Sequence, residues 1–248
     1  MAAIWCLNEE DIIPWTVRHL LEQGIDVHVF DNWSSDRTFE LLHAFGERIR
    51  LERWPAQRET CSSLTSRLQY LERYALETQY DWIIHHDADE IRRTRSGETL
   101  IEFIRRADRE GFNAIDHVAE TYLPKEGWDG SQDPETFFDR RLPGSYDQRS
   151  VHIKAWKKQP PHAFAFNVED KTGQTISGQA LGVNLWATGG HEALFLGRNV
   201  APEKLVLKHY PLRTQAHALR KVAERERSYA ADELGWGWHV QYRQPWWK

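Results

Sequence analysis

Short apolar runs alternate with amphipathic segments along the first part of the chain. The runs that predict buried β-strands are residues 2–7, 25–30, 48–54 and 81–86. Between them, residues 9–23 and 61–78 predict helices by their apolar spacing. Residues 31–36 form a polar turn that could cap a further helix, which carries Phe39, Leu41 and Leu42. Strands that alternate with helices are typical of a mostly parallel α/β sheet with helices on both faces.

The pattern becomes mixed after residue 90. We expect helices over residues 99–109 and 214–232, and strands over residues 113–118, 151–156, 174–186 and 205–210. Residues 122–150 form a long polar segment interrupted by glycines and prolines. Long irregular segments inside compact domains are usually binding loops or lids, so this one could order over a substrate. A chain of 248 residues is long enough for one large α/β domain.

Polar residues follow three of the predicted strands at the point where each strand ends. The clusters are Asn8-Glu9-Glu10, Asp31-Asn32 and Asp87-Ala88-Asp89. Ligands of parallel sheets bind at the carboxyl ends of the strands, so we expect the clusters to converge on one edge. Neighbouring carboxylates repel one another, and a divalent cation with phosphate oxygens in its shell relieves that repulsion. The pattern predicts a metal-dependent enzyme that acts on a nucleotide-linked substrate.

Charge and cysteine content narrow the class of protein. A formal net charge of -5 and a pI near 6.2 give no electrostatic reason to expect a nucleic-acid partner. Cys6 and Cys61 are too few for a disulfide framework, which favours a reducing cytosol. Because no apolar run is long enough to span a bilayer and the N-terminus lacks a signal-peptide pattern, we expect a soluble cytoplasmic protein.

Tryptophan is frequent, with 12 residues in the chain. A cluster lies near the C-terminus, at positions 236, 238, 246 and 247. Indole rings pack against the C–H faces of sugars and also settle at membrane interfaces. The tail could line an acceptor pocket, pack back on the domain, or contact the inner face of a membrane. Trp236 and Trp238 are therefore candidate acceptor-binding residues.

Three segments together resemble the family 2 glycosyltransferases, which have a GT-A fold. They are Asn8-Glu9-Glu10-Asp11, residues 29–38 around Asp31-Asn32, and residues 82–90 around Asp87-Ala88-Asp89. Two later segments, Gly189-Gly190-His191-Glu192 and residues 208–213 around His209, are similar to later motifs of bacterial members. The resemblance implies one Rossmann-like GT-A domain over residues 1–248. Its nucleotide-binding half would be residues 1–95, and its mixed acceptor-binding half residues 96–248, with a C-terminal helix and the Trp-rich tail.

The resemblance also implies roles for single residues. The expected metal-binding residues are Asp87, Asp89 and His209. Asp89 would be the direct ligand, Asp87 would lie nearer the ribose or a metal-bound water, and His209 would be the C-terminal metal ligand. Asp31 would bind the base or the ribose. The full set of expected donor-binding residues is Asn8, Glu9, Asp31, Asn32, Arg67 and Asp87. Trp33 departs from the family pattern, because relatives often have glycine at this position, as they do at Arg37.

An inverting transfer needs a base that deprotonates the acceptor hydroxyl. The family places this carboxylate between the Asp-x-Asp pair and the late histidine, which makes Glu192 the first candidate. The glycines before it permit close backbone approach to a substrate, and His191 could orient the acceptor or the base. Asp170 is a rival, because Val168-Glu169-Asp170 resembles the same motif.

The sequence thus favours a metal-dependent glycosyltransferase. It would move a sugar from a nucleotide-sugar donor to a glycan or lipid-linked acceptor, with inversion, to build a bacterial-type surface glycan. Carboxylate oxygens suit both Mn²⁺ and Mg²⁺, and an added imidazole favours Mn²⁺. A nucleotidyltransferase with an acidic metal site and a non-catalytic sugar-binding protein stay open as alternatives. The oligomeric state also stays open.

Other polar residues around the acidic motif allow two interpretations. Strand alternation places His85 on the face of Asp87 and Asp89, where it could lie near the metal or pack as a structural residue. The same alternation turns Glu90 to the other side. The basic residues that follow could reach phosphate or form a solvated charge run, and they are Arg92, Arg93 and Arg95.

Overall fold

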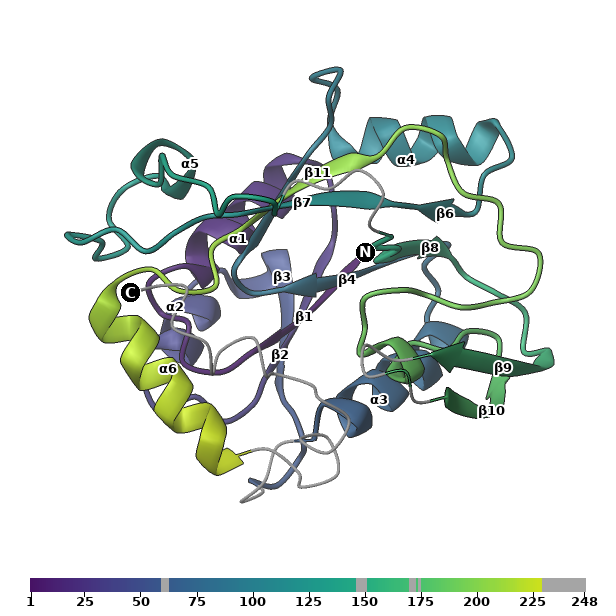
Figure 1. Cartoon of the computed structure of the whole chain (residues 1–248), viewed down its shortest axis with the longest axis horizontal. Helices are drawn as coiled ribbons and strands as arrows, with labels where there is room; N and C mark the ends of the chain where they lie inside the picture. The colour runs from purple at the N-terminus through teal and green to yellow at the C-terminus, as the bar shows by residue number, and fades with distance from the viewer. Residues whose placement is uncertain (59–62, 146–150, 170–172, 174, 229–248) are drawn as a thin grey trace.

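A computed structural model describes residues 1–58, 63–145, 151–169, 173 and 175–228. Its centre is a six-stranded sheet with the order β3-β2-β1-β4-β8-β6 (Figure 1). The strands are β1 Ala2–Cys6, β2 Val27–Asp31, β3 Ile49–Arg53, β4 Trp82–Asp87, β6 Ala114–Ile115 and β8 Ala155–Lys157. Strands β1 to β4 are parallel, whereas β8 is antiparallel to both β4 and β6. The predicted mostly parallel sheet is confirmed.

A smaller sheet and a hairpin make up the mixed second half. The three-stranded sheet has the order β5-β11-β7, with β5 Glu90–Arg93, β11 Leu205–His209 and β7 His117–Thr121. The hairpin pairs β9 Ala163–Glu169 with β10 Thr175–Leu181. Because β5 follows β4 directly and pairs with β11, a late segment of the chain returns to the end of the central sheet.

Helices cover the central sheet, and local sequence explains where several of them begin and end. They are α1 Ile13–Glu22, α2 Thr38–His43, α3 Leu64–Glu77, α4 Leu100–Arg109, α5 Pro134–Phe137 and α6 Gln215–Ser228, with short 3₁₀ turns η1 Gly46–Arg48 and η2 Trp186–Thr188. Ser63 caps α3 through its side chain, and Thr99 and Glu102 form a capping box at α4. Gly24 ends α1 with a φ of 74°, a left-handed conformation that glycine adopts without strain.

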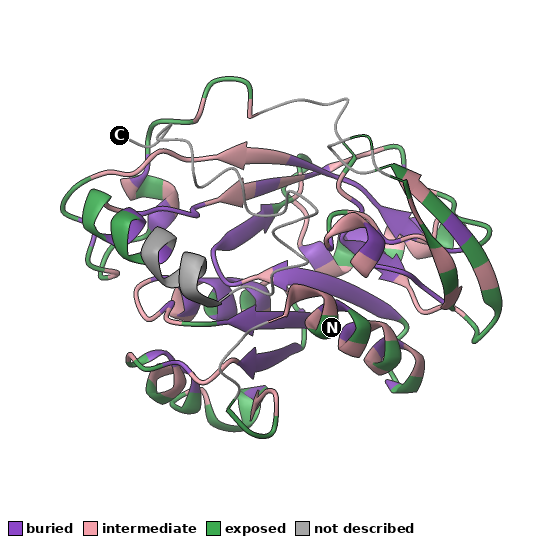
Figure 2. Cartoon of the chain, turned by 60° about the horizontal axis from the view of Figure 1, so that its bottom comes forward, coloured by how far each residue is buried: buried purple, intermediate pink, exposed green. Residues whose placement is uncertain are grey.

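The apolar core lies on both faces of the central sheet. On one face, Ile4 and Val29 pack with α1 and α4 through residues such as Val17 and Phe103. On the other face, strand residues pack with α3, and this group includes Trp5, Phe30, Ile83 and Leu71. Figure 2 shows the central strands buried along their length. Burial on two faces explains why these strands read as continuous apolar runs in the sequence.

Several elements of the second half differ from the sequence pattern. The predicted strand over residues 174–186 is shorter, because β10 ends at Leu181 and pairs with β9, which the pattern does not predict. Most positions of both hairpin strands alternate between exposed and half-buried, and Phe166 is the buried residue of β9. Strand β5 is also unpredicted, because it is short and highly charged. The predicted strand over residues 113–118 is divided between β6 and β7.

Two sequence expectations concern the chain as a whole. Across the described residues, the search for a helix both long and apolar enough to cross a bilayer finds no candidate. Cys6 is a free, buried thiol, and burial together with Asp31 raises its pKa well above the usual range. Cys61 lies outside the described residues.

The capping box of α4 gives a test of the fold. Thr99 Oγ1 accepts a hydrogen bond from the Glu102 amide at 3.4 Å, and Glu102 Oε2 accepts one from the Thr99 amide at 2.8 Å. Thr99→Ala should lower the free energy of unfolding by about 1 kcal/mol in urea denaturation. Thr99→Ser keeps the hydroxyl and should retain most of the stability. Equal losses in the two variants would contradict the capping role.

Candidate functional site

The loops after β1 and β2 are joined by hydrogen bonds. The Asn8 amide donates to Ser34 Oγ at 3.0 Å, and Asn8 Oδ1 accepts from the Ser35 amide at 2.8 Å. The Glu9 amide donates to Thr38 Oγ1 at 2.8 Å. Asn8 has a φ of 55°, and asparagine tolerates this left-handed conformation better than most residues. Two of the three predicted polar clusters therefore meet at one edge of the sheet.

Asp31 is buried at the end of β2 and organises the second loop. Its Oδ2 accepts hydrogen bonds from the Ser34 amide at 3.1 Å and from Arg53 NH1 at 2.9 Å. The Arg53 guanidinium also lies 4.9 Å from the centre of the Trp33 ring and 4.1 Å from that of Phe39. The structure thus places Asp31 beside a guanidinium held between two aromatic rings.

Trp33, which stands where relatives often have glycine, adopts a backbone conformation that glycine favours. Its φ is 58°, the left-handed region that glycine favours, and its indole Nε1 donates to the Pro55 carbonyl at 2.9 Å. Asn32 follows Asp31 and donates its amide to the Cys6 carbonyl at 2.9 Å, which ties the loop to β1. The hydrogen bond from the indole therefore holds Trp33 in a conformation that glycine would adopt without strain.

An acidic corner, defined here as Glu9, Asp11 and Asp89, lies where β1 and β4 end. Arg213 NH2 is 2.6 Å from both Glu9 Oε2 and Asp11 Oδ1, and Arg213 NH1 is 3.9 Å from Asp89 Oδ2. Lys221 of α6 bridges Glu9 Oε1 at 2.8 Å and Asp89 Oδ2 at 2.9 Å. The third polar cluster therefore joins the first through cations from the end of the chain.

The charges of the acidic corner are strongly coupled. Burial alone would raise the pKa of Asp89, but Lys221, His209 and Arg213 outweigh it and hold that pKa well below the usual range. Burial likewise opposes ionisation of Asp11, yet Arg213 lowers its pKa to about 2. Arg213 is fully buried, so its charge depends on these carboxylates. The lowered pKa values keep Asp11 and Asp89 ionised near neutral pH.

Asp89 and His209, two of the predicted metal ligands, lie close together. The pairing of β11 with β5 sets His209 opposite Glu90, next to Asp89, and His209 Nε2 lies 3.6 Å from Asp89 Oδ1. Adjacent ligands of an octahedral cation at about 2.1 Å lie roughly 3 Å apart, so this pair fits two positions of Mn²⁺ or Mg²⁺ after a small adjustment. Among the described residues, no group of three or more His, Cys, Asp or Glu side chains is arranged to hold a metal ion.

Asp87 belongs to a second, neighbouring network. Lys154 Nζ is 2.7 Å from Asp87 Oδ2 and 2.6 Å from Glu90 Oε1, and Arg92 NH2 is 2.9 Å from Glu90 Oε2. Burial opposes ionisation of Asp87, but Lys154 and His85 hold its pKa well below the usual range. The Asp87 side chain is still 48% exposed, so a ligand can reach it.

This network corrects two interpretations of the sequence. Glu90 does not turn away from Asp87, because both carboxylates contact Lys154 and Glu90 is buried against Arg92. Arg92 neither forms a solvated charge run nor reaches toward phosphate, because it is fully buried and donates to the His85 carbonyl. Arg93 forms an ion pair with Glu135, and Arg95 is exposed.

The glycine turn with the candidate base packs against β4. His85 Nδ1 lies 3.0 Å from the Gly190 carbonyl, so His85 is a structural residue in this structure. A Cβ on Gly190 would lie 2.7 Å from His85 Cε1, and Gly190 has a φ of 79°, so only glycine fits this approach. Glu192 Oε1 is 2.7 Å from Arg198 NH1, and His191 is exposed. The turn is thus held against β4 by His85, which lies two residues before Asp87.

Glu72 of α3 holds the start of the same turn through hydrogen bonds. Its Oε1 accepts hydrogen bonds from the Leu185 amide at 2.6 Å and the Trp186 amide at 3.1 Å, at the start of η2. Burial raises the pKa of Glu72 to about 7, although these amides act in the opposite direction. Arg67, an expected donor-binding residue, lies in the first turn of α3 beside Leu68, which contacts the Gly190 position.

Three sequence candidates cannot be placed. Asp170, the rival base, and the acceptor candidates Trp236 and Trp238 lie outside the described residues. Conversely, the structure adds Lys154, Arg213 and Lys221 to the site. No local pattern assigns this role to Lys154 or Lys221, and Arg213 ends the late segment 208–213 without a role that the sequence gives it. Only their distance to the acidic clusters, which the fold sets, identifies them.

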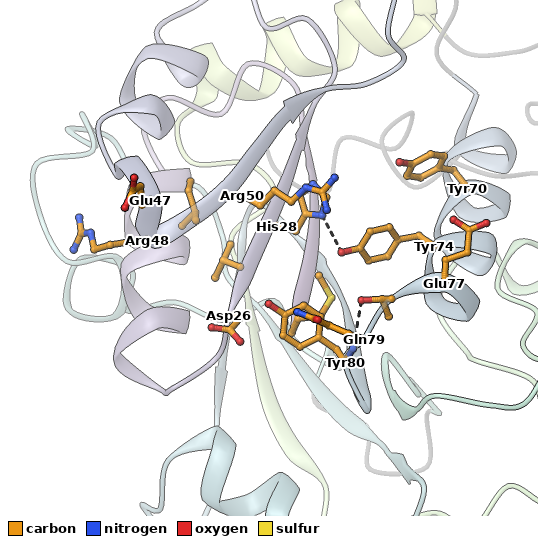
Figure 3. A pocket seen from close by; sticks show the side chains of 14 residues that line it. Asp26, His28, Glu47, Arg48, Arg50, Tyr70, Tyr74, Glu77, Gln79 and Tyr80 are labelled. Carbon is orange, nitrogen blue, oxygen red and sulfur yellow. Dashed lines mark hydrogen bonds between the residues drawn. The ribbon is translucent and has the colours of Figure 1, made fainter.

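A surface hollow lies at the opposite end of the sheet. It has a volume of about 700 Å³ and is lined by residues at the start of β2 and the end of α3, among them Asp26, His28, Tyr74 and Tyr80 (Figure 3). Tyr74 Oη lies 3.1 Å from His28 Nδ1 across it. These residues belong to the amino ends of the parallel strands, whereas ligands of such sheets bind at the carboxyl ends. The hollow is therefore separate from the candidate site.

Comparisons with known proteins give matches among solved structures. No protein-family model matches the chain, and no curated protein matches it. TarS residues 1–349 of S. aureus, in complex with UDP, match at 15% identity and a TM-score of 0.36, over 53% of this chain and 37% of that chain. Another S. aureus TarS structure matches at 10% identity and a TM-score of 0.45, over 93% of this chain and 40% of that chain.

A second protein gives a similar result. Glucosyl-3-phosphoglycerate synthase from Mycobacterium tuberculosis, in complex with Mn²⁺, UDP and glucosyl-3-phosphoglycerate, matches at 20% identity and a TM-score of 0.35. The match covers 48% of this chain and 43% of that chain. The alignments span less than half of each matched chain. The likeness is one of fold, and at these identities and TM-scores it assigns no activity to this chain.

The raised pKa of Glu72 gives a pH-dependent prediction. Because the folded pKa of about 7 exceeds the ordinary value of 4.5, the folded state holds its proton more tightly. The corresponding stability is present below about pH 4.5 and is lost as the pH rises through about 7. Glu72→Gln removes this loss and keeps the acceptor oxygen. The variant should gain roughly 1–3 kcal/mol relative to the wild type between about pH 5 and about pH 8 in urea unfolding.

Glu77→Gln is the matched control, since Glu77 is exposed on the same helix. Its stability relative to the wild type should change little with pH. If the difference in unfolding free energy between Glu72→Gln and the wild type is the same at about pH 5 and about pH 8, burial does not shift the pKa of Glu72.

Proposed function

We propose that the chain is a metal-dependent glycosyltransferase that moves a sugar from a nucleotide-sugar donor to a glycan or lipid-linked acceptor, with inversion. The observation that carries the proposal is the pairing of Asp89 with His209 at the carboxyl edge of a parallel sheet. Ligands of such sheets bind at this edge, and a carboxylate–imidazole pair suits Mn²⁺ or Mg²⁺. The resemblance of the surrounding motifs to family 2 glycosyltransferases supports the same activity.

Asp89 and His209 would hold the cation, and donor phosphate oxygens and water would complete its shell. When bound, the cation neutralises the charge that develops on the diphosphate leaving group. Asp87 contacts Lys154 and is the more exposed of the two aspartates. Its exposed part faces the same edge and would bind the ribose or a metal-bound water.

The joined loops after β1 and β2 would hold the nucleoside. Asn8 fixes the loop conformation through Ser34 and Ser35, and Asn32 lies at its start. Asp31 is already paired with Arg53, so the base or ribose would meet both charges of that pair together. The Trp33 ring beside Arg53 offers an apolar surface for the base. Arg67 would approach from α3.

Glu192 is the base that we propose for the acceptor hydroxyl. The Gly189-Gly190 turn holds it near β4, and Thr188 fixes its backbone through hydrogen bonds to its amide at 3.1 Å and its carbonyl at 2.7 Å. Arg198 pairs with one carboxylate oxygen and would have to release it, since an ion pair weakens a base. His191 would orient the acceptor, with Trp236 and Trp238 as its further contacts.

The metal-binding role of Asp89 is testable by nucleotide binding. The wild type should bind UDP, GDP or ADP by calorimetry in the presence of Mn²⁺, and binding should weaken on metal removal. Asp89→Asn should lower the affinity of the preferred nucleotide by at least about tenfold, because the cation loses its charged ligand. Asp108→Asn, which breaks a distant surface ion pair with Lys157, is the matched control. Metal-independent binding, or none, would refute the proposal.

The base assignment predicts a loss of turnover without a loss of binding. Glu192→Gln should lower kcat for sugar transfer by roughly 10²–10⁴-fold and leave the affinity for the nucleoside diphosphate unchanged. Asp170→Asn should be tested in parallel, with a panel of nucleotide sugars and product detection by mass spectrometry. If Asp170→Asn loses turnover and Glu192→Gln retains it, the roles of the two carboxylates are reversed.

A further inference from the structure

The Lys221 ammonium lies in the acidic corner, where the proposed divalent cation would bind. Its Nζ bridges Glu9 and Asp89, and its side chain is 9% exposed. Figure 1 shows α6, which carries it, lying across the edge to which β1 and β4 point. Building on the glycosyltransferase function above, we propose that the divalent cation displaces Lys221 from Asp89, and that the freed ammonium then binds the diphosphate of the donor.

The first step follows from the limited access to Asp89. Its side chain is only 8% exposed, with Lys221 Nζ at 2.9 Å from Oδ2 and His209 Nε2 at 3.6 Å from Oδ1. A cation bound to Asp89 and His209 would lie within a few ångströms of the Lys221 ammonium. Like charges at such a distance repel strongly in a partly buried site. The ion pair and the metal complex therefore exclude each other.

Lys221 is the cation of the corner that can move. Arg213 is fully buried and is fixed by Asp11 through Nε at 3.0 Å and NH2 at 2.6 Å, besides its bond to Glu9. A guanidinium with several oriented bonds is held rigidly, whereas a lysine ammonium is a point charge on a flexible stem. When Lys221 leaves, Glu9 keeps Arg213 as its partner and Asp89 gains the metal. No carboxylate is left without a counter-ion.

The second step follows from the place of α6. Its first turn is tied down, because the His217 amide donates to Thr214 Oγ1 at 3.0 Å and the Gln215 amide to Glu126 Oε1 at 2.9 Å. The released ammonium therefore stays at the corner and needs an anion there. The diphosphate that completes the metal shell is that anion, and a charge-assisted bond to lysine is favourable.

Lys221→Met tests the two steps separately, because it should raise the affinity for Mn²⁺ and lower the affinity for UDP. Mn²⁺ alone, followed by the loss of its free electron paramagnetic resonance signal, should bind about tenfold more tightly than to the wild type, since no ammonium competes. At saturating Mn²⁺, UDP should bind at least about tenfold more weakly by calorimetry, because a charge-assisted bond to phosphate is missing. Lys157→Met, which removes a lysine from a surface ion pair, should change neither affinity.

The outcomes distinguish this inference from the proposed function. If the wild type binds neither Mn²⁺ nor UDP, GDP or ADP, the function itself is wrong. If the wild type binds them and Lys221→Met has an unchanged or weaker affinity for Mn²⁺, the displacement is refuted. If its affinity for UDP is unchanged, the contact of Lys221 with the diphosphate is refuted.

Lysine acetylation read by mass spectrometry tests the same exchange in the wild type, without any variant. Lys221 should react slowly in the free protein, faster when Mn²⁺ is added, and slowly again with Mn²⁺ and UDP together. Lys157, which is 43% exposed, provides the reference rate. A Lys221 rate that does not rise with Mn²⁺ would contradict the displacement.

Discussion

The structure depends on the neutralisation of carboxylates that gather at one edge of the central sheet. Asp89 and Glu9 lie at the ends of neighbouring strands and are both buried, so they cannot remain ionised without positive partners. Arg213 and Lys221 supply that charge from the end of the chain, more than 100 residues away in sequence. The pairing of β11 with β5 and β7 returns this part of the chain to the first half of the molecule and brings His209 to Asp89, and α6 then adds Lys221.

The apolar framework makes that arrangement precise. Helices α1 and α4 cover one face of the sheet and α3 covers the other, so the strand ends have little freedom to move. The loops after β1 and β2 are then locked to each other by hydrogen bonds rather than by apolar contacts. A rigid core with a polar rim suits the proposed site, which would hold a cation and a charged nucleotide in fixed positions.

The second network, around Lys154, has a different task. Asp87 and Glu90 share one ammonium, and Arg92 joins Glu90 to the backbone of His85. The same His85 holds the Gly190 turn. The network therefore links the acidic motif to the segment that carries Glu192. The loss of a partner in either network should destabilise the fold, because an unpaired buried charge is unfavourable in free energy.

Much of the structure of residues 1–95 follows from the sequence, because the strands there are buried on both faces and the loops carry polar clusters. Local pattern was enough to predict the parallel sheet, the convergence of Asn8 and Asp89, and, with the family resemblance, the meeting of Asp89 with His209. The hairpin, strand β5 and the roles of Lys154, Arg213 and Lys221 emerged only from the tertiary structure. A single lysine or arginine carries no local signal of its partner, since an ion pair is decided by distance in space, and only the folded chain sets that distance.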